Sequence, residues 1–149
     1  MTTTYAQSSH AAESLASIRV ADAMHRGVVG CGPDARLTTV ARVMAAHRIH
    51  AVVVALGEES PEWSLVSDLD LTAAISDGRL ENTTAGQVAS PPNLCVAADE
   101  TVARAAQLMR EYDTHHLIVV TRGADRPVGI LSTLDIADVI AELPYSDVW

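Results

Sequence analysis

Residues 67–75 read SDLDLTAAI, and residues 132–140, which lie 65 positions further along the chain, read STLDIADVI. Both stretches have a serine first, a leucine third, an aspartate fourth and an isoleucine last. The same offset relates further pairs upstream, namely Asp34 and Asp99, Leu37 and Val102, Ala41 and Ala106, Met44 and Met109, and His50 and His115. A single register without a gap covers about 45 residues of each copy, which indicates an internal repeat.

Hydrophobic periodicity changes in the same order within each copy, so each copy predicts strand, helix, strand, strand, helix. Short aliphatic runs predict the strands and i, i+3, i+4 spacing predicts the helices. We expect Asp34 and Asp99 to be the N-caps of the first helix of each copy. The expected elements are strands at 28–29, 52–54 and 63–66 with helices at 37–45 and from 68, and strands at 94–96, 117–120 and 128–131 with helices at 102–109 and from 133.

One copy is too small to bury both faces of its own sheet. We therefore expect an α/β (α+β) fold in which two β-α-β-β-α repeats pack sheet to sheet with pseudo-two-fold symmetry. The expected organisation is an N-terminal extension at 1–17, a first motif at 18–76, a connector at 77–83, a second motif at 84–142 and a C-terminal tail at 143–149.

Composition excludes several classes of protein. The formal net charge of −9 opposes binding to nucleic acid or to an anionic membrane. We find neither a signal peptide nor an apolar run long enough to span a membrane, and this favours a cytoplasmic location. Cys31 and Cys95 lie in apolar, strand-like surroundings without metal-ligand spacing and are interpreted as reduced core residues.

No metal site and no catalytic activity are expected. His47 and His50 are three residues apart, but they span a predicted helix end and have no third ligand. No nucleophile has a recognisable base beside it in sequence, and no phosphate-binding glycine loop occurs. We therefore predict a protein that is not an enzyme.

A hydroxyl and a carboxylate stand three residues apart at the start of the last helix of each copy. These pairs are Ser67 with Asp70 and Ser132 with Asp135. A carboxylate can accept hydrogen bonds from both hydroxyls of a ribose, and a helix N-terminus offers amides to a phosphate. The same spacing also describes a capping box, which satisfies the amides of the helix itself, and the two roles can coexist.

The order and the residues of the repeat resemble the cystathionine β-synthase (CBS) domain pair, or Bateman module. The matching segments are 20–24, 33–37, 109–120 and 129–136, and the resemblance runs from about residue 18 to residue 142. The sequence departs from the family pattern at Ser64, where a glycine is usual, at Val53 and Ile118, where a proline is frequent, and at residues 85–88.

The resemblance implies a regulatory pair that binds AMP, ADP, ATP or S-adenosylmethionine between its motifs, needs no other cofactor, forms a homodimer and signals to an effector protein. Because the chain has no room for an effector domain, we expect a separate sensor chain. The alternative is a structural dimerisation or adaptor domain whose nucleotide clefts bind nothing.

We expect the second-copy site, formed by Ser132, Thr133 and Asp135, to be the stronger one. Asp68 would repel a phosphate beside Ser67, whereas Thr133 adds a hydroxyl and Gly129 permits a close approach of backbone. The remaining candidates are Val28, Val29, Asn93 and Leu94 for an adenine slot, and Arg48, His115 and His116 for phosphate.

Overall fold

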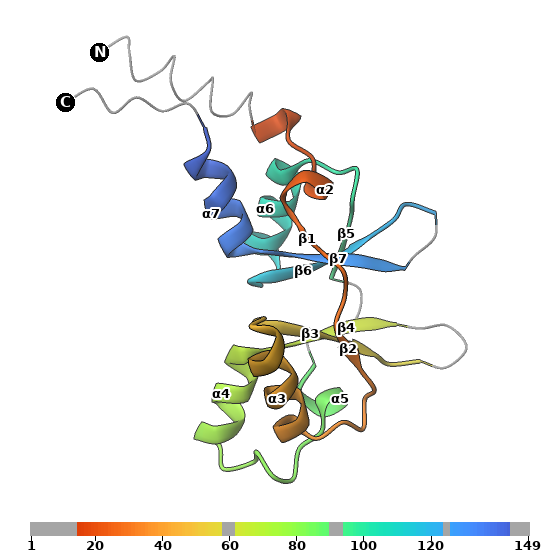
Figure 1. The fold of residues 1–149 in the computed structure, drawn as a ribbon, viewed down its shortest axis with the longest axis vertical. Coiled ribbons are helices and arrows are strands. Elements are labelled where there is room, and N and C mark those ends of the chain that lie inside the picture. The colour runs from red at the N-terminus through yellow and green to blue at the C-terminus, as the bar shows by residue number, and fades with distance from the viewer. Residues whose placement is uncertain (1–14, 58–61, 90–93, 124–125, 144–149) are drawn as a thin grey trace, which may run out of the picture. The chain divides into compact units, whose positions relative to one another are not determined.

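The computed structural model describes residues 15–57, 62–89, 94–123 and 126–143. The chain divides into two compact units. The first-copy unit is Gly27–Leu94, and the second-copy unit combines Met1–Arg26 with Cys95–Trp149 (Figure 1). Each unit consists of a β-sheet with helices, so the predicted α+β fold class with two sheets is confirmed. The expected packing of sheet on sheet stays a prediction.

The first-copy unit has a three-stranded sheet in the order β2-β3-β4. Strand β2 is parallel to β3, and β3 is antiparallel to β4. The buried side chains are small and aliphatic, which fits a protein without phenylalanine. Its elements are β2 (Gly30–Cys31), α3 (Leu37–His47), β3 (Ala51–Ala55), β4 (Trp63–Ser67), α4 (Asp68–Ser76) and α5 (Ala85–Val88).

The second-copy unit repeats this arrangement and adds one strand. Its sheet has the order β1-β7-β6-β5, with β5 parallel to β6 and both other pairs antiparallel. Cys95 lies opposite Ile118 as Gly30 lies opposite Val53, so the register of the parallel pair is conserved at the 65-residue offset. The elements are α2 (Val20–Ala23), β1 (His25–Arg26), β5 (Cys95–Ala97), α6 (Val102–Glu111), β6 (His116–Val120), β7 (Pro127–Ser132) and α7 (Thr133–Ala141).

The short helix that leads into each copy belongs to the compact unit of the other copy. The Val20 amide of α2 donates to the Glu100 carbonyl (2.8 Å), and the Ala85 amide of α5 donates to the Ala35 carbonyl (2.8 Å). Ala85 is fully buried in the first-copy core beside Leu37. The leading helices are thus exchanged. The second-copy unit therefore combines two separate stretches of sequence, whereas the first-copy unit is one continuous stretch.

The predicted N-caps Asp34 and Asp99 are wrong. Helix α3 begins later, with Arg36 as its N-cap and no side-chain cap. Helix α6 is capped by Thr101, whose side chain accepts from the Arg104 amide at 3.1 Å. Both helices begin where the backbone leaves an extended bridge to the leading segment of the other copy, so tertiary pairing rather than the local aspartate sets the first turn.

Two opening strands are also displaced from their expected positions. Strand β2 begins at Gly30 rather than at Val28, and β5 begins at Cys95 rather than at Leu94. Val29 still contributes to the sheet because its carbonyl accepts from the Val53 amide at 3.0 Å. Within the described part of the chain, no helix combines the length and apolar character needed to cross a membrane.

Candidate functional site

Helices α4 and α7 each begin with a closed capping box. In the first-copy unit, the Ser67 amide and hydroxyl donate to Asp70 Oδ2 at 2.8 and 3.1 Å. In the second-copy unit, the Ser132 amide and hydroxyl donate to Asp135 Oδ2 at 2.7 and 3.0 Å. The aspartate amide donates back to the serine hydroxyl in both units. The capping interpretation of the repeated motif is therefore confirmed, and in each box one carboxylate oxygen takes both bonds.

The helix starts offer fewer free amides than a bare N-terminus would. The first amide of α4, on Asp68, donates to the His50 carbonyl at 2.9 Å, and the first amide of α7, on Thr133, donates to the His115 carbonyl at 3.0 Å. The third amide belongs to the capping box. A phosphate at either helix would thus find chiefly the second amide, on Leu69 or Leu134.

The second carboxylate oxygen distinguishes the two boxes. Asp135 Oδ1 lies 2.7 Å from His25 Nδ1, and the Asp135 side chain is only 2% exposed. Asp70 is half-buried, and its Oδ1 has no hydrogen-bond or ion-pair partner among the described residues. The carboxylate of the second copy is thus enclosed by protein atoms where its counterpart is partly open.

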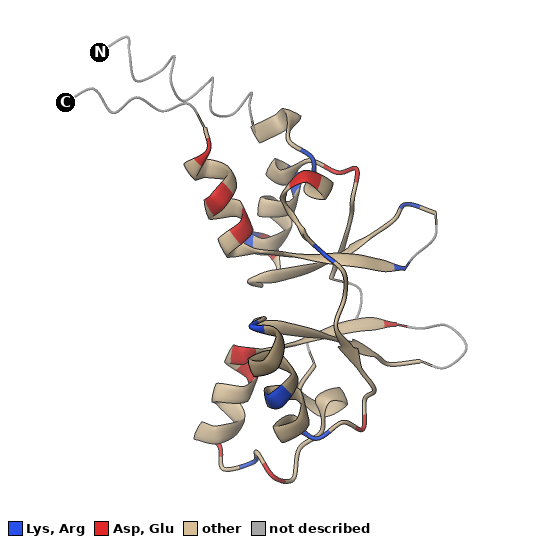
Figure 2. Cartoon of the chain, viewed as in Figure 1, with Lys and Arg blue, Asp and Glu red and all other residues tan. Residues whose placement is uncertain are grey.

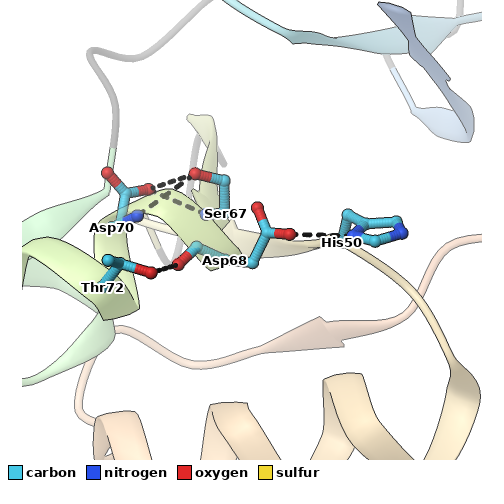
Figure 3. A network of polar contacts seen from close by, with 5 residues as sticks. All are labelled: His50, Ser67, Asp68, Asp70 and Thr72. Atoms are coloured by element: carbon cyan, nitrogen blue, oxygen red, sulfur yellow. Dashed lines mark hydrogen bonds and ion pairs between the residues drawn. The ribbon is translucent and has the colours of Figure 1, made fainter. Parts of the chain in front are cut away.

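In the first copy, a histidine binds the neighbouring acid instead. His50 Nδ1 lies 2.8 Å from Asp68 Oδ2, and both side chains are more than half exposed (Figure 3). Figure 2 shows acidic residues at the start of α4 and along α7. The charge of Asp68, which we expected to repel a phosphate, therefore has a histidine partner that offsets it whenever the imidazole is protonated.

Gly129 has a structural role that the sequence did not indicate. It lies opposite Arg26 in the β1–β7 pair, and a Cβ at this position would overlap the His25 carbonyl oxygen and come within 2.9 Å of Met24 Sδ. The backbone that approaches Gly129 is thus the chain's own strand β1. The close approach that Gly129 permits is therefore explained by β1, and a ligand contact at this glycine stays a prediction.

The residues expected to bind adenine or phosphate lie partly near the Ser132 motif and partly elsewhere on the surface. His116 is the first residue of β6 and lies opposite Ser132, whereas His115 is exposed one residue earlier. Arg48 is exposed and ends α3 in a left-handed conformation with a φ of 52°. Val28, Val29 and Leu94 are half-buried next to strands, and Asn93 lies outside the described residues. Of these, the structure brings His116 together with the Ser132 motif, and leaves Arg48 and His115 on the surface.

The remaining candidate groups are clusters of metal ligands and the two cysteine thiols. No group of three or more His, Cys, Asp or Glu side chains in the described ranges has the geometry to hold a metal ion. Cys31 and Cys95 are half-buried, and no disulfide joins either of them to a described residue. Burial raises the pKa of the Cys31 thiol, which lowers its reactive thiolate fraction.

Two segments, residues 20–77 and 85–142, match the family model described as CBS domain. The chain belongs to the CBS domain family. The match covers most of the sequence and includes both capping boxes, so the repeat is a tandem pair of CBS motifs. No curated protein matches the chain.

Solved structures of CBS proteins share the fold. A CBS domain protein from Pyrobaculum aerophilum complexed with AMP has a TM-score of 0.72 and 25% identity, covering 85% of this chain and 98% of that chain. Hypoxic Response Protein I with two coordinated zinc ions has a TM-score of 0.64 and 25% identity, over 80% of this chain and 97% of the other. A CBS domain pair in complex with 5′-methylthioadenosine and S-adenosyl-L-methionine has a TM-score of 0.71 and 18% identity, over 83% and 95%.

Proposed function

We propose that the chain is a regulatory, non-catalytic CBS pair that binds an adenosyl nucleotide, with an AMP-like ligand preferred. The ribose hydroxyls would donate to Asp135 or Asp70. The phosphate would be bound by Ser132 and Thr133, or by Ser67 in the first copy. The effect of the ligand would reach an effector protein through a change in the arrangement of the chain, which requires the ligand to favour one arrangement over another.

The observation that carries the proposal is the AMP complex of the similar CBS protein from Pyrobaculum aerophilum, which is covered over 98% of its length. The repeated serine and aspartate at the starts of α4 and α7 supply the acceptor and hydroxyl chemistry that a ribose phosphate needs. A monophosphate is favoured over ATP because each helix start has few open amides and no arginine in its first turn.

The proposal is tested by thermal shift with AMP, ADP, ATP, S-adenosylmethionine and NAD. A ligand at about 100 times its dissociation constant adds roughly 2.7 kcal/mol and raises the melting temperature by about 5–10 °C. We expect AMP to give the largest shift. Asp135→Ala should weaken AMP binding by roughly 10- to 100-fold, and Asp70→Ala by less. No shift with any of the five compounds would overturn the proposal.

A structural dimerisation or adaptor domain is the second candidate, and one observation favours it. The exposed large apolar side chains include two repeat-related pairs, Leu69 with Leu134 and Ile75 with Ile140, which are 46–65% exposed on α4 and α7. On this second hypothesis these four side chains form the contact with a protein partner, as contiguous exposed apolar patches do. A second copy of this chain would cover it in a homodimer.

Sedimentation equilibrium tests this second candidate. The double variant Leu69→Glu, Leu134→Glu should shift the chain from dimer to monomer, while the control Thr72→Glu, Ala137→Glu on the same two helices should shift it less. A dimer that persists unchanged in the leucine variant would rule out this surface as its interface.

A further inference from the structure

Two carboxylates in the same local structure differ in one contact. Asp70 and Asp135 both accept two bonds at Oδ2 from the serine of their capping box. Within the described part of the chain, only Asp135 also has a histidine at its other oxygen, with His25 Nδ1 at 2.7 Å. Oδ1 is the atom that the cap leaves for a ligand, so His25 occupies the acceptor that a ribose would use.

The backbone of His25 is fixed next to this acid. His25 lies opposite Ile130 in the β1–β7 pair, and its carbonyl fills the space above Gly129. The imidazole is 77% exposed while the carboxylate is 2% exposed, so the ring lies on the solvent side of the acid. Because the strand holds the backbone, a rotation of the side chain is enough to move the ring, and such rotations are fast in exposed residues.

We propose that His25 covers Asp135, and that an adenosyl ligand must displace the imidazole before its ribose reaches the carboxylate. This inference rests on the proposed function and assigns a control element to its second-copy site. The apparent association constant at this site is then the intrinsic association constant multiplied by the fraction of molecules in which the carboxylate is uncovered. Among the described residues, no side chain covers Asp70 in this way, and the histidine of the first-copy site, His50, binds Asp68.

Carboxyl labelling tests the cover without any nucleotide. A water-soluble carbodiimide with glycine ethyl ester modifies accessible carboxylates, and mass spectrometry gives the rate at each aspartate. In the unmodified protein we expect Asp135 to react several-fold more slowly than Asp70. His25→Ala should raise the Asp135 rate toward that of Asp70. The matched control His50→Ala removes the other histidine–aspartate pair and should raise labelling at Asp68 alone. An Asp135 rate unchanged by His25→Ala would overturn the cover.

Nucleotide titration then tests the link to function. Calorimetric titration with AMP is carried out in an Asp70→Ala background, which leaves the second-copy site intact. Adding His25→Ala should tighten AMP binding about tenfold, whereas adding His50→Ala should leave it unchanged. Unchanged or weaker binding with His25→Ala would overturn the cover while the proposed function stands. If no variant binds AMP but Asp135 labelling rises as expected, the proposed function fails and the His25 contact remains as a purely structural one.

Discussion

The starts of α4 and α7 share a capping box but differ in what surrounds it. Asp70 keeps one oxygen without a described partner and is half-buried, while Asp135 is almost fully enclosed and bound by His25. The source of the difference is strand β1, which pairs with β7 in the second-copy sheet. Duplicated sequence thus gives duplicated local structure, whereas the accessibility of the same acid depends on a segment far away in the chain.

The comparison adds accessibility as a second criterion for ranking the two sites. From sequence, the second copy has the more suitable residues, because Thr133 replaces Asp68 and Gly129 replaces Ser64. In the structure, Gly129 accommodates β1, Asp68 has His50 as a partner, and the second-copy acid is the covered one. The residue types therefore favour the second-copy site, whereas the accessibility of the aspartate favours the first-copy site. Ligand binding to the two aspartate variants and the labelling rates of the two carboxylates measure these two properties.

The largest expected effect comes from making the second copy like the first at Gly129. In Gly129→Ser, the new side chain overlaps the His25 carbonyl and must displace β1. We expect a loss of about 2–4 kcal/mol in the free energy of unfolding, measured by urea denaturation. The matched reverse change, Ser64→Gly, introduces no overlap and should cost less. Equal losses of unfolding free energy in the two variants would contradict the close contact of β1 with Gly129.

Removal of the capping acids should have the next largest effect. Asp135→Ala removes the carboxylate half of the α7 capping box and also the partner of His25, so we expect a loss of about 2 kcal/mol. Asp70→Ala removes only the carboxylate half of the α4 capping box, and we expect a loss of about 1 kcal/mol. Urea denaturation of the two variants at neutral pH provides the comparison. A larger loss from Asp70→Ala would contradict the difference between the two boxes.

The first helices of the two copies offer a smaller contrast. The Thr101 hydroxyl caps α6, while Arg36 at the start of α3 supplies no side-chain cap. Thr101→Ala should therefore cost about 1 kcal/mol, and Arg36→Ala should cost much less. Thermal melting of both variants gives the measurement, and similar melting temperatures for the two would refute the assignment.

The smallest effect is expected from an exposed ion pair of the second copy. The Arg122 guanidinium donates to Asp99 and holds the pKa of that carboxyl below its usual value. The carboxylate therefore stabilises the folded state above the ordinary pKa of an aspartate, and this contribution disappears as the pH falls through the lowered pKa. Asp99→Asn should slightly lower the melting temperature at pH 7 and have no effect in strong acid. A difference that persists at low pH would exclude the pair as its cause.

Much of the fold could be predicted from the sequence because its signals are local. The spacing of apolar residues identified α3 and α6, and β-branched runs identified β3 and β6, each within one or two residues at the ends. The capping boxes followed from serine and aspartate at fixed spacing. Repetition strengthened every one of these predictions, since each pattern occurred twice in one register.

The features that could not be predicted depend on contacts between residues far apart in the sequence. The caps at Asp34 and Asp99 were wrong because a bridge to another segment sets the start of each helix, and Asp99 binds Arg122 instead. The contact between His25 and Asp135 has no local signal, because β1 is two residues long and has no counterpart among the described residues of the first copy. The exchange of the leading helices could not be predicted from hydrophobic periodicity either, because it also depends on contacts between residues far apart in the sequence.

The exchange of the leading helices means that a single repeat cannot complete its own fold. A polypeptide carrying one repeat would contain its own sheet and helices, but the place beside its first long helix would be empty, because a repeat's own leading helix docks elsewhere. Two such polypeptides could complete each other only by reciprocal swapping, at a rate and occupancy set by their concentration. Joining them in tandem makes the swap intramolecular, with an effective concentration in the millimolar range for a short tether. Duplication thereby converts a concentration-dependent association into a property of a single folded chain.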